Sequence, residues 1–276
     1  MNKRVGGEAI MGLGGGKVSA ESTRNLEIAE DLCRKGRPYE AVPYLQKALE
    51  DTRNLDAPIQ LAFLAPNFKE SIRILGDAKK LGEVFLRADL GEKCLDDDGD
   101  RVGHYWSLIE TRPYMRVLQA LVRFYVEDGR FDQAANTSIE MLRLNPGDNQ
   151  GQRTWTGPLL LKANRPADAL SFLQHWLEPA AREGKIVPRG GCDFEAPSKE
   201  PLSAGVIESL GKHVEGTFVY TAALAAFKLW GPCELAEQYL TIATELNPAV
   251  LLKVLGKIAR PSLYLAVAIP VLEQRR

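Results

Sequence analysis

The chain is poor in the residues that build metal sites and disulfides. It has four cysteines and three histidines among 276 residues, and no two cysteines form a Cys-x-x-Cys motif. A structural zinc site needs about four such ligands at tight local spacing. We therefore expect no metal site, no cofactor and four reduced thiols, as is usual in a reducing compartment.

Excess charge of one sign and long apolar runs are also missing. Lys plus Arg number 35 and Asp plus Glu number 36, so the net charge is −1. A nucleic-acid-binding domain usually carries a basic excess or a basic stripe, so we expect no nucleic-acid partner. No run of about 18 apolar residues occurs, so no membrane span is expected, and the N-terminus lacks the apolar core of a signal peptide. We expect a cytoplasmic protein, with a nuclear location open.

Motifs for nucleotide, calcium and hydrolytic chemistry are incomplete or absent. A phosphate loop over residues 12–17 would need a Gly where Met11 stands and a Ser or Thr where Val18 stands. A calcium loop over the acidic run 96–100 would place Cys94 at its first ligand position, where an Asp is needed. No Ser-His-Asp or His-Glu-x-x-His pattern is evident, and we expect no intrinsic catalysis.

What the sequence does contain is a repeated spacing of Gly, Ala and Pro. In two segments an Ala lies five residues after a Gly and twelve before a Pro: Gly129, Ala134 and Pro146, then Gly231, Ala236 and Pro248. Ala41 and Ala169 lie in segments that repeat the first half of this pattern. Ala134 and Ala169 are 35 residues apart, close to the period of about 34 residues in helix-turn-helix repeats.

Each part of this spacing has a physical reason. A small residue is required where two helices approach closely, a Gly tolerates the left-handed conformation of a turn, and a Pro ends the second helix. The pattern predicts an all-α fold, a helix-turn-helix repeat solenoid in the form of a tetratricopeptide-like superhelix. Residues 56–93 form a degenerate helical pair out of register with the repeat, and residues 179–205 form a Pro/Gly-rich insertion.

Three segments follow from this pattern. Residues 1–20 are expected to be a disordered Gly-rich tail, and residues 21–260 a helical repeat domain with its irregular insertion at 179–205. Residues 261–276 are expected to be a C-terminal cap or tail. The best repeat should contain helices over 113–128 and 131–144, and the four tryptophans should lie in helix packing.

On these residues the chain resembles the tetratricopeptide-repeat class, with Gly129, Ala134 and Pro146 at its turn, small-residue and terminal-proline positions. Residues 110–123 and 142–153 are similar to a block in repeat proteins of the suppressor of tumorigenicity 7 family. They look closer still to fungal repeat proteins that carry a separate MYND-type zinc finger. The chain lacks the closely spaced Cys and His of that finger and the membrane span of animal members. The resemblance therefore implies a helical scaffold without zinc.

In such repeats the first helix of each pair lines the concave groove. With Met115 at the first repeat position, Arg116, Gln119, Arg123 and Glu127 should project toward it. The two arginines could hold a carboxylate or an acidic peptide; alternatively they are solvated or form intramolecular ion pairs. We expect a protein-interaction scaffold that binds a protein or peptide partner in this groove, with its oligomeric state open.

A polar cluster surrounds the predicted inter-repeat turn. Its residues are Asn145, Pro146, Asp148, Asn149, Gln150 and Arg153. We expect Asp148 or Asn149 to cap the next helix and the others to lock the turn. Two alternative functions stay open: a regulatory fragment of a longer multidomain protein whose zinc-finger part is missing here, and, less favoured, a hydrolase using this cluster.

Overall fold

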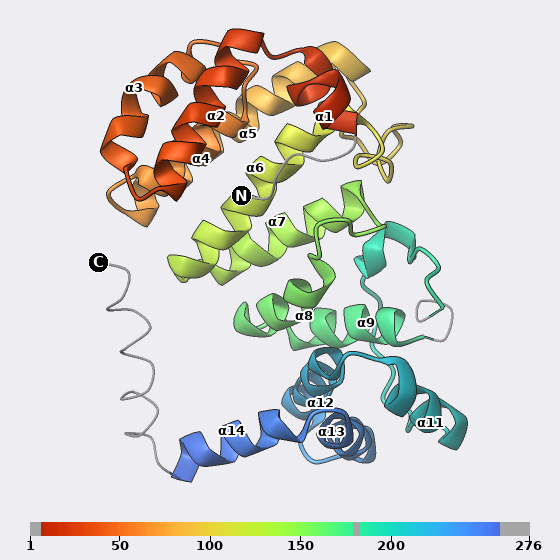
Figure 1. The fold of residues 1–276 in the computed structure, drawn as a ribbon. Coiled ribbons are helices and arrows are strands. Elements are labelled where there is room, and N and C mark those ends of the chain that lie inside the picture. The colour runs from red at the N-terminus through yellow and green to blue at the C-terminus, as the bar shows by residue number, and fades with distance from the viewer. Residues whose placement is uncertain (1–6, 179–182, 260–276) are drawn as a thin grey trace. The chain divides into compact units, whose positions relative to one another are not determined.

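A computed structural model describes residues 7–178 and 183–259, and the regular secondary structure among these residues consists of helices, joined by turns and irregular segments (Figure 1). They divide into two compact units, Met1–Arg165 with Ile186–Phe194 and Pro166–Lys185 with Glu195–Arg276. None of the helices described is both long and apolar enough to cross a membrane.

The first unit is built from packed helical pairs. Its helices and 3-10 turns are α1 (Gly7–Met11), η1 (Leu13–Gly16), α2 (Ala20–Arg34), α3 (Pro38–Leu49), α4 (Asp56–Leu64), α5 (Phe68–Leu90), η2 (Ile109–Thr111), α6 (Arg112–Glu127), α7 (Phe131–Leu144), α8 (Arg153–Lys162) and η3 (Pro188–Gly191). Helix α2 packs on α3, α4 on α5, and α6 on α7. The first helices of these pairs also touch, α2 with α4 and α4 with α6.

The second unit has the same kind of pairing. It contains α9 (Pro166–Leu177), α11 (Ala204–His213), α12 (Gly216–Trp230), α13 (Glu234–Leu246) and α14 (Pro248–Ala259). Helix α12 packs on both α9 and α13, and α11 packs on α13 (Figure 1). The prediction of an all-α fold in packed pairs is confirmed.

The repeated alanines are buried in the helical core. Ala41, Ala134 and Ala169 are completely buried, and Ala236 is 6% exposed. In the first pair Leu26 and Ala29 of α2 meet Ala41 and other buried residues of α3 in one core. A longer side chain at these positions would push the helices apart, because protein interiors are close-packed.

The turns between paired helices contain a residue with positive φ, as predicted, but the backbone conformation of that residue is not the same in every turn. Gly129 has a φ of 73°, and Arg130 N–H donates to the Tyr125 carbonyl across the end of α6. Asn164 occupies the same turn after α8 with a φ of 56°, since Asn tolerates this conformation. Gly231 instead has a φ of 69° and a ψ of −154°, a region open to glycine alone.

Residues 7–20 differ from the expected disordered tail. Helix α1 and η1 are ordered there, with Leu13 only 1% exposed and Glu8 6% exposed. Leu13 belongs to the core of α2 and α3. A glycine-rich composition alone did not reveal this, because one leucine and one buried ion pair anchor the segment.

Helix α8 begins only at Arg153, because the backbone at 146–151 forms turns. Helix α11 was not predicted; it begins where the insertion was expected to end. The expected C-terminal cap or tail at 261–276 lies outside the described residues.

The Pro/Gly-rich insertion is held by hydrogen bonds and close packing. Within residues 186–194, Gly190 lies against α7: a Cβ there would come within 2.7 Å of the Leu142 Cβ. Arg189 also forms an ion pair with Asp97 at 3.0 Å. In its later part Ser198 exchanges two hydrogen bonds with the side chain of Gln174. Residues 186–203 are irregular, as expected, but contacts fasten them at Arg189, Gly190 and Ser198.

Candidate peptide-binding groove along helix α6

Helix α6 presents a polar row on a strongly apolar helix. Pro113 lies in its first turn, where a missing N–H costs nothing. Its buried side includes Tyr114, Met115, Leu118 and Leu121. The polar residues Arg116, Gln119, Arg123 and Glu127 follow one another at intervals of three or four, so they share one face of the helix.

This face lines a groove of about 460 Å³, within the range of ligand pockets. All four residues of the predicted row belong to its wall. The rest of the wall comes from α4, α6 and the start of α8: Ile59, Phe63, Ala120, Val122, Val126, Gln152 and Trp155. The groove is therefore mostly apolar, with charged side chains along it.

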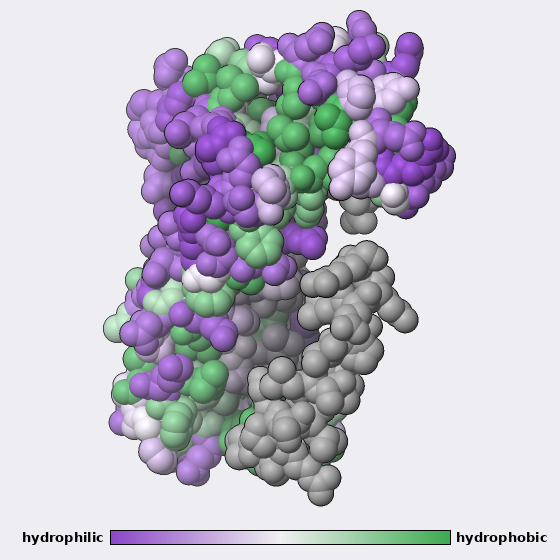
Figure 2. All heavy atoms as spheres, turned by 90° about the vertical axis from the view of Figure 1, so that its left-hand side faces the viewer, coloured by the Kyte–Doolittle hydropathy of each residue, from purple (hydrophilic) through white to green (hydrophobic). Residues whose placement is uncertain are grey.

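Two aromatic side chains of the groove are exposed. Phe63 is 41% exposed and Trp155 is 55% exposed. Trp155 contradicts the expectation that the tryptophans serve helix packing, whereas Trp176 is buried in α9 as expected. Exposed aromatic residues are typical anchors of protein interfaces. On the face drawn in Figure 2, apolar residues likewise form patches bordered by hydrophilic ones.

Arg116 is not free to bind a ligand in this state. Its Nε and Nη2 donate to the two carboxylate oxygens of Asp56, both at 2.7 Å. Its Nη1 and Nη2 also donate to Glu8, at 2.7 and 2.9 Å. Burial by itself lowers the pKa of Arg116, but the Asp56 and Glu8 carboxylates outweigh burial and raise it. Of the two alternatives for Arg116, the structure shows the intramolecular ion pair.

Arg123 and Glu127 are exposed and have no ion-pair partner among the residues that the structure describes. The Arg123 guanidinium lies 5.1 Å from the centre of the Phe63 ring, in a cation–π contact. That contact orients Arg123 without neutralising it. Arg123 is therefore the cation of the predicted row that can still receive a carboxylate.

Gln119 ties the groove to the inter-repeat turn. Its Nε2 donates to the Gln150 carbonyl at 3.3 Å, and Gln150 Nε2 donates back to Gln119 Oε1 at 3.3 Å and to the Met115 carbonyl at 3.2 Å. The side-chain oxygen of Gln150 is buried without a hydrogen-bond partner among the described residues. The turn thus sits directly on α6.

The predicted helix cap is formed by Asp148. It has a φ of 50°, and its carboxylate accepts hydrogen bonds from the Gln152 N–H at 2.5 Å and the Arg153 N–H at 3.1 Å. Asn145 is buried, and its carbonyl accepts from the Asp148 N–H at 3.0 Å. Pro146 is buried and Asn149 exposed. The carboxylate oxygens that a hydrolase would need as a base are thus engaged in the cap.

Buried hydroxyls then position α8 and its tryptophan. Ser138 Oγ of α7 lies 2.7 Å from Thr156 Oγ1 of α8, and both side chains are fully buried. Trp155 is the neighbour of Thr156, so this bond and the Asp148 cap set the side of α8 that faces the groove. Burial raises the pKa of Asp148, and the hydrogen bonds from the Arg153 and Gln152 backbone oppose the rise.

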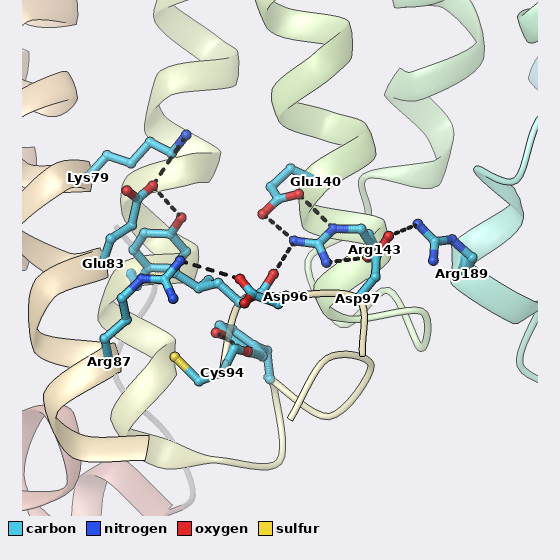
Figure 3. A network of polar contacts seen from close by, with 12 residues as sticks. Lys79, Glu83, Arg87, Cys94, Asp96, Asp97, Glu140, Arg143 and Arg189 are labelled. Atoms are coloured by element: carbon cyan, nitrogen blue, oxygen red, sulfur yellow. Dashed lines mark hydrogen bonds and ion pairs between the residues drawn. The ribbon is translucent and has the colours of Figure 1, made fainter. Parts of the chain in front are cut away.

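The acidic run 96–100 is part of an ion-pair network on the first unit (Figure 3). Arg143 of α7 forms ion pairs with Asp97 at 2.7 Å and with Glu140 at 2.8 Å. Asp97 forms a second ion pair with Arg189. Asp96 lies 3.5 Å from Arg87. These carboxylates form ion pairs with arginine side chains of the protein. Among the described residues, no group of three or more His, Cys, Asp or Glu side chains is arranged to hold a metal ion.

Several residues of the site were not found from the sequence, among them Glu8, Asp56, Phe63 and Trp155. Glu8 lies 108 positions from Arg116, and no local pattern connects them. Phe63 lies near the end of α4 and Trp155 near the start of α8, where the apolar periodicity does not distinguish a core position from a groove wall. For Trp155, the only sequence feature that could have indicated a site residue is its position close to the polar turn.

Comparison with protein-family models gives no match, and comparison with the curated proteins gives none either.

Proposed function

We propose that the chain is a protein-interaction scaffold of the tetratricopeptide-like solenoid class, whose groove along α6 binds a peptide segment of a partner. One observation carries the proposal. The groove wall is drawn from α4, α6 and the start of α8, with α4 and α6 the first helices of successive pairs. First helices line the concave surface of such repeats, and that is where a solenoid offers an extended binding face.

The chemistry of the wall supports a peptide rather than a reacting substrate. Phe63 and Trp155 offer large exposed rings that lose little side-chain entropy on binding. Arg123 and Glu127 offer charges of opposite sign one helical turn apart. A peptide with an apolar side chain between the two rings and a carboxylate on Arg123 fits this arrangement. No nucleophile with an adjacent base lines the groove among the residues described.

A displayed library of random twelve-residue peptides, selected on the purified full-length chain, tests the proposal. We expect enriched peptides whose affinity falls at least about tenfold on Trp155→Ala, the usual effect of removing an interface aromatic anchor. Phe227→Ala is the matched control, since Phe227 is an aromatic residue of α12 with 53% exposure outside the groove. Equal loss with both variants, or no enrichment on the wild type, would contradict the proposal.

A further inference from the structure

Helix α1 is held by the carboxylate of Glu8 and by the close approach of Gly7 to the Ile109 side chain. Of its five residues only Glu8 is buried, whereas Ile10 is 87% exposed and Met11 56% exposed. Gly12 separates α1 from Leu13, which is buried in the core of α2 and α3. The leucine that anchors the N-terminal segment in the core therefore lies outside α1, and the polar contact that fastens α1 is its Glu8 carboxylate.

That carboxylate occupies donors of a residue in the groove wall. Glu8 accepts from Nη1 and Nη2 of Arg116 in a two-point contact, the geometry in which arginine recognises carboxylates. Glu8 is not itself a groove-lining residue. When α1 leaves, these two donors become available beside the groove.

The second carboxylate on Arg116 makes Glu8 the exchangeable one. Asp56 is fully buried at the start of α4 and holds Nε and Nη2. Without Glu8, Arg116 keeps its two hydrogen bonds to Asp56. With Glu8, two carboxylates share one guanidinium and repel each other, which weakens the hold on α1. The fold therefore keeps its buried ion pair whether α1 is docked or released.

We infer that Arg116, supported by Asp56, is a concealed binding site for the glutamate side chain of a partner peptide, and that Glu8 on α1 closes it as an internal competitor. The inference rests on the proposed groove function and adds its ligand chemistry and its regulation. Glu8 stands in for the ligand: a side-chain carboxylate on a polypeptide. A partner glutamate takes the same two donors, and α1 undocks at Gly12 while Leu13 stays buried.

Two peptide pools test the inference on the full-length chain. Both are acetylated and amidated hexapeptides with random flanking residues, and they differ only in Glu or Gln at the third position. We expect the Glu8→Ala protein to retain the Glu pool about tenfold better than the wild type does, because the replaced contact is a charge-assisted pair. Retention of the Gln pool should not change. Glu70→Ala is the matched control, an exposed ion-paired glutamate outside the groove.

A second measurement reports on α1 directly. Hydrogen exchange of the amides in residues 7–12 should quicken in Glu8→Ala, and in the wild type on addition of the Glu pool, while residues 20–34 stay protected. A third pool, with a free C-terminus and Gln at the third position, distinguishes recognition of a side chain from recognition of a terminal carboxylate. If Glu8→Ala improves retention of that pool alone, the assignment to a glutamate side chain is wrong.

The remaining outcomes are separable. An equal gain for the Glu and Gln pools means that α1 blocks the groove by bulk, which overturns carboxylate competition. Retention that depends on Trp155 but ignores Glu8 overturns this inference and leaves the proposed function standing. No retention by any of the proteins, including Glu8→Ala, overturns both.

Discussion

Helices α6 and α12 begin the two pairs that share the Gly-Ala-Pro spacing, yet they present opposite chemistry. When the two pairs are aligned on Ala134 and Ala236, each polar residue of the α6 row corresponds to a residue of α12. The corresponding residues are Arg116 and Phe218, Gln119 and Thr221, Arg123 and Ala225, and Glu127 and Leu229. Thr221 is the only polar member of the second row. One spacing thus builds two helical hairpins, while the side chains on the outer face decide whether that face becomes a charged groove wall or more core.

The largest expected difference lies at the first position of this row. Arg116→Leu removes the guanidinium that pairs with the fully buried Asp56, which should lower the free energy of unfolding by about 3–5 kcal/mol. Phe218→Leu removes only part of an apolar side chain and should cost about 1–2 kcal/mol. Urea unfolding followed by circular dichroism measures both. Equal costs would mean that the ion-pair triad is not a structural element of the first unit.

The repeated alanines should respond alike in the two pairs. Ala134→Leu and Ala236→Leu both insert a side chain where two helices meet, and each should cost about 1–3 kcal/mol. Ala134 is fully buried and Ala236 is 6% exposed, so the first should cost more. Thermal unfolding of the two variants beside Ala→Leu at exposed Ala249 checks this. A negligible effect at either site would break the comparison of the two pairs.

Substitution of the two turn glycines should have different costs in stability, although both glycines stand at the same position of the Gly-Ala-Pro spacing. Gly129→Ala should cost about 1 kcal/mol, because its left-handed turn is one that Asn164 also adopts. Gly231→Ala should cost up to about 3 kcal/mol, because its φ and ψ lie where only glycine is unstrained. Neither site has an atom within 4 Å of an added Cβ, so the contrast is purely conformational. Substitution by Asn sharpens it: Asn should be tolerated at 129 and not at 231.

The smallest expected contrast concerns pH and the insertion. Arg189 and Arg143 hold the pKa of Asp97 below its ordinary value of 3.8. Because the native pKa is lowered, this contact contributes stability above pH 3.8 and loses it as the pH falls through the lowered pKa. Residues 195–203 are instead held by neutral partners, Ser171, Gln174 and Gln238.

Hydrogen exchange, corrected for intrinsic rates, should therefore show acid loosening residues 186–194 before residues 195–203. Protection of α6 and α7 in the same samples controls for global unfolding. Simultaneous loosening of both parts of the insertion would show that Asp97 does not govern its attachment.

Much of the helical framework could be predicted because it depends on local spacing. Small residues, turn formers and prolines at fixed intervals indicate where helices begin, pack and end, so α6 and α7 were placed within one residue at each boundary. Helix α11 was missed because Gly205 and Gly211 weaken its helical signal. The polar row of α6 was likewise visible, since residues three and four apart share a helix face.

Local spacing by itself thus determined an all-α chain of paired helices, the burial of its recurrent alanines and the four residues of the α6 row. Only the tertiary structure decided what that row does. It brought Glu8 from the N-terminal segment and Asp56 from α4 onto Arg116, set Phe63 under Arg123, and left Trp155 exposed beside them. These contacts join residues far apart in the chain, and periodicity along one helix carries no information about which distant side chain will meet it.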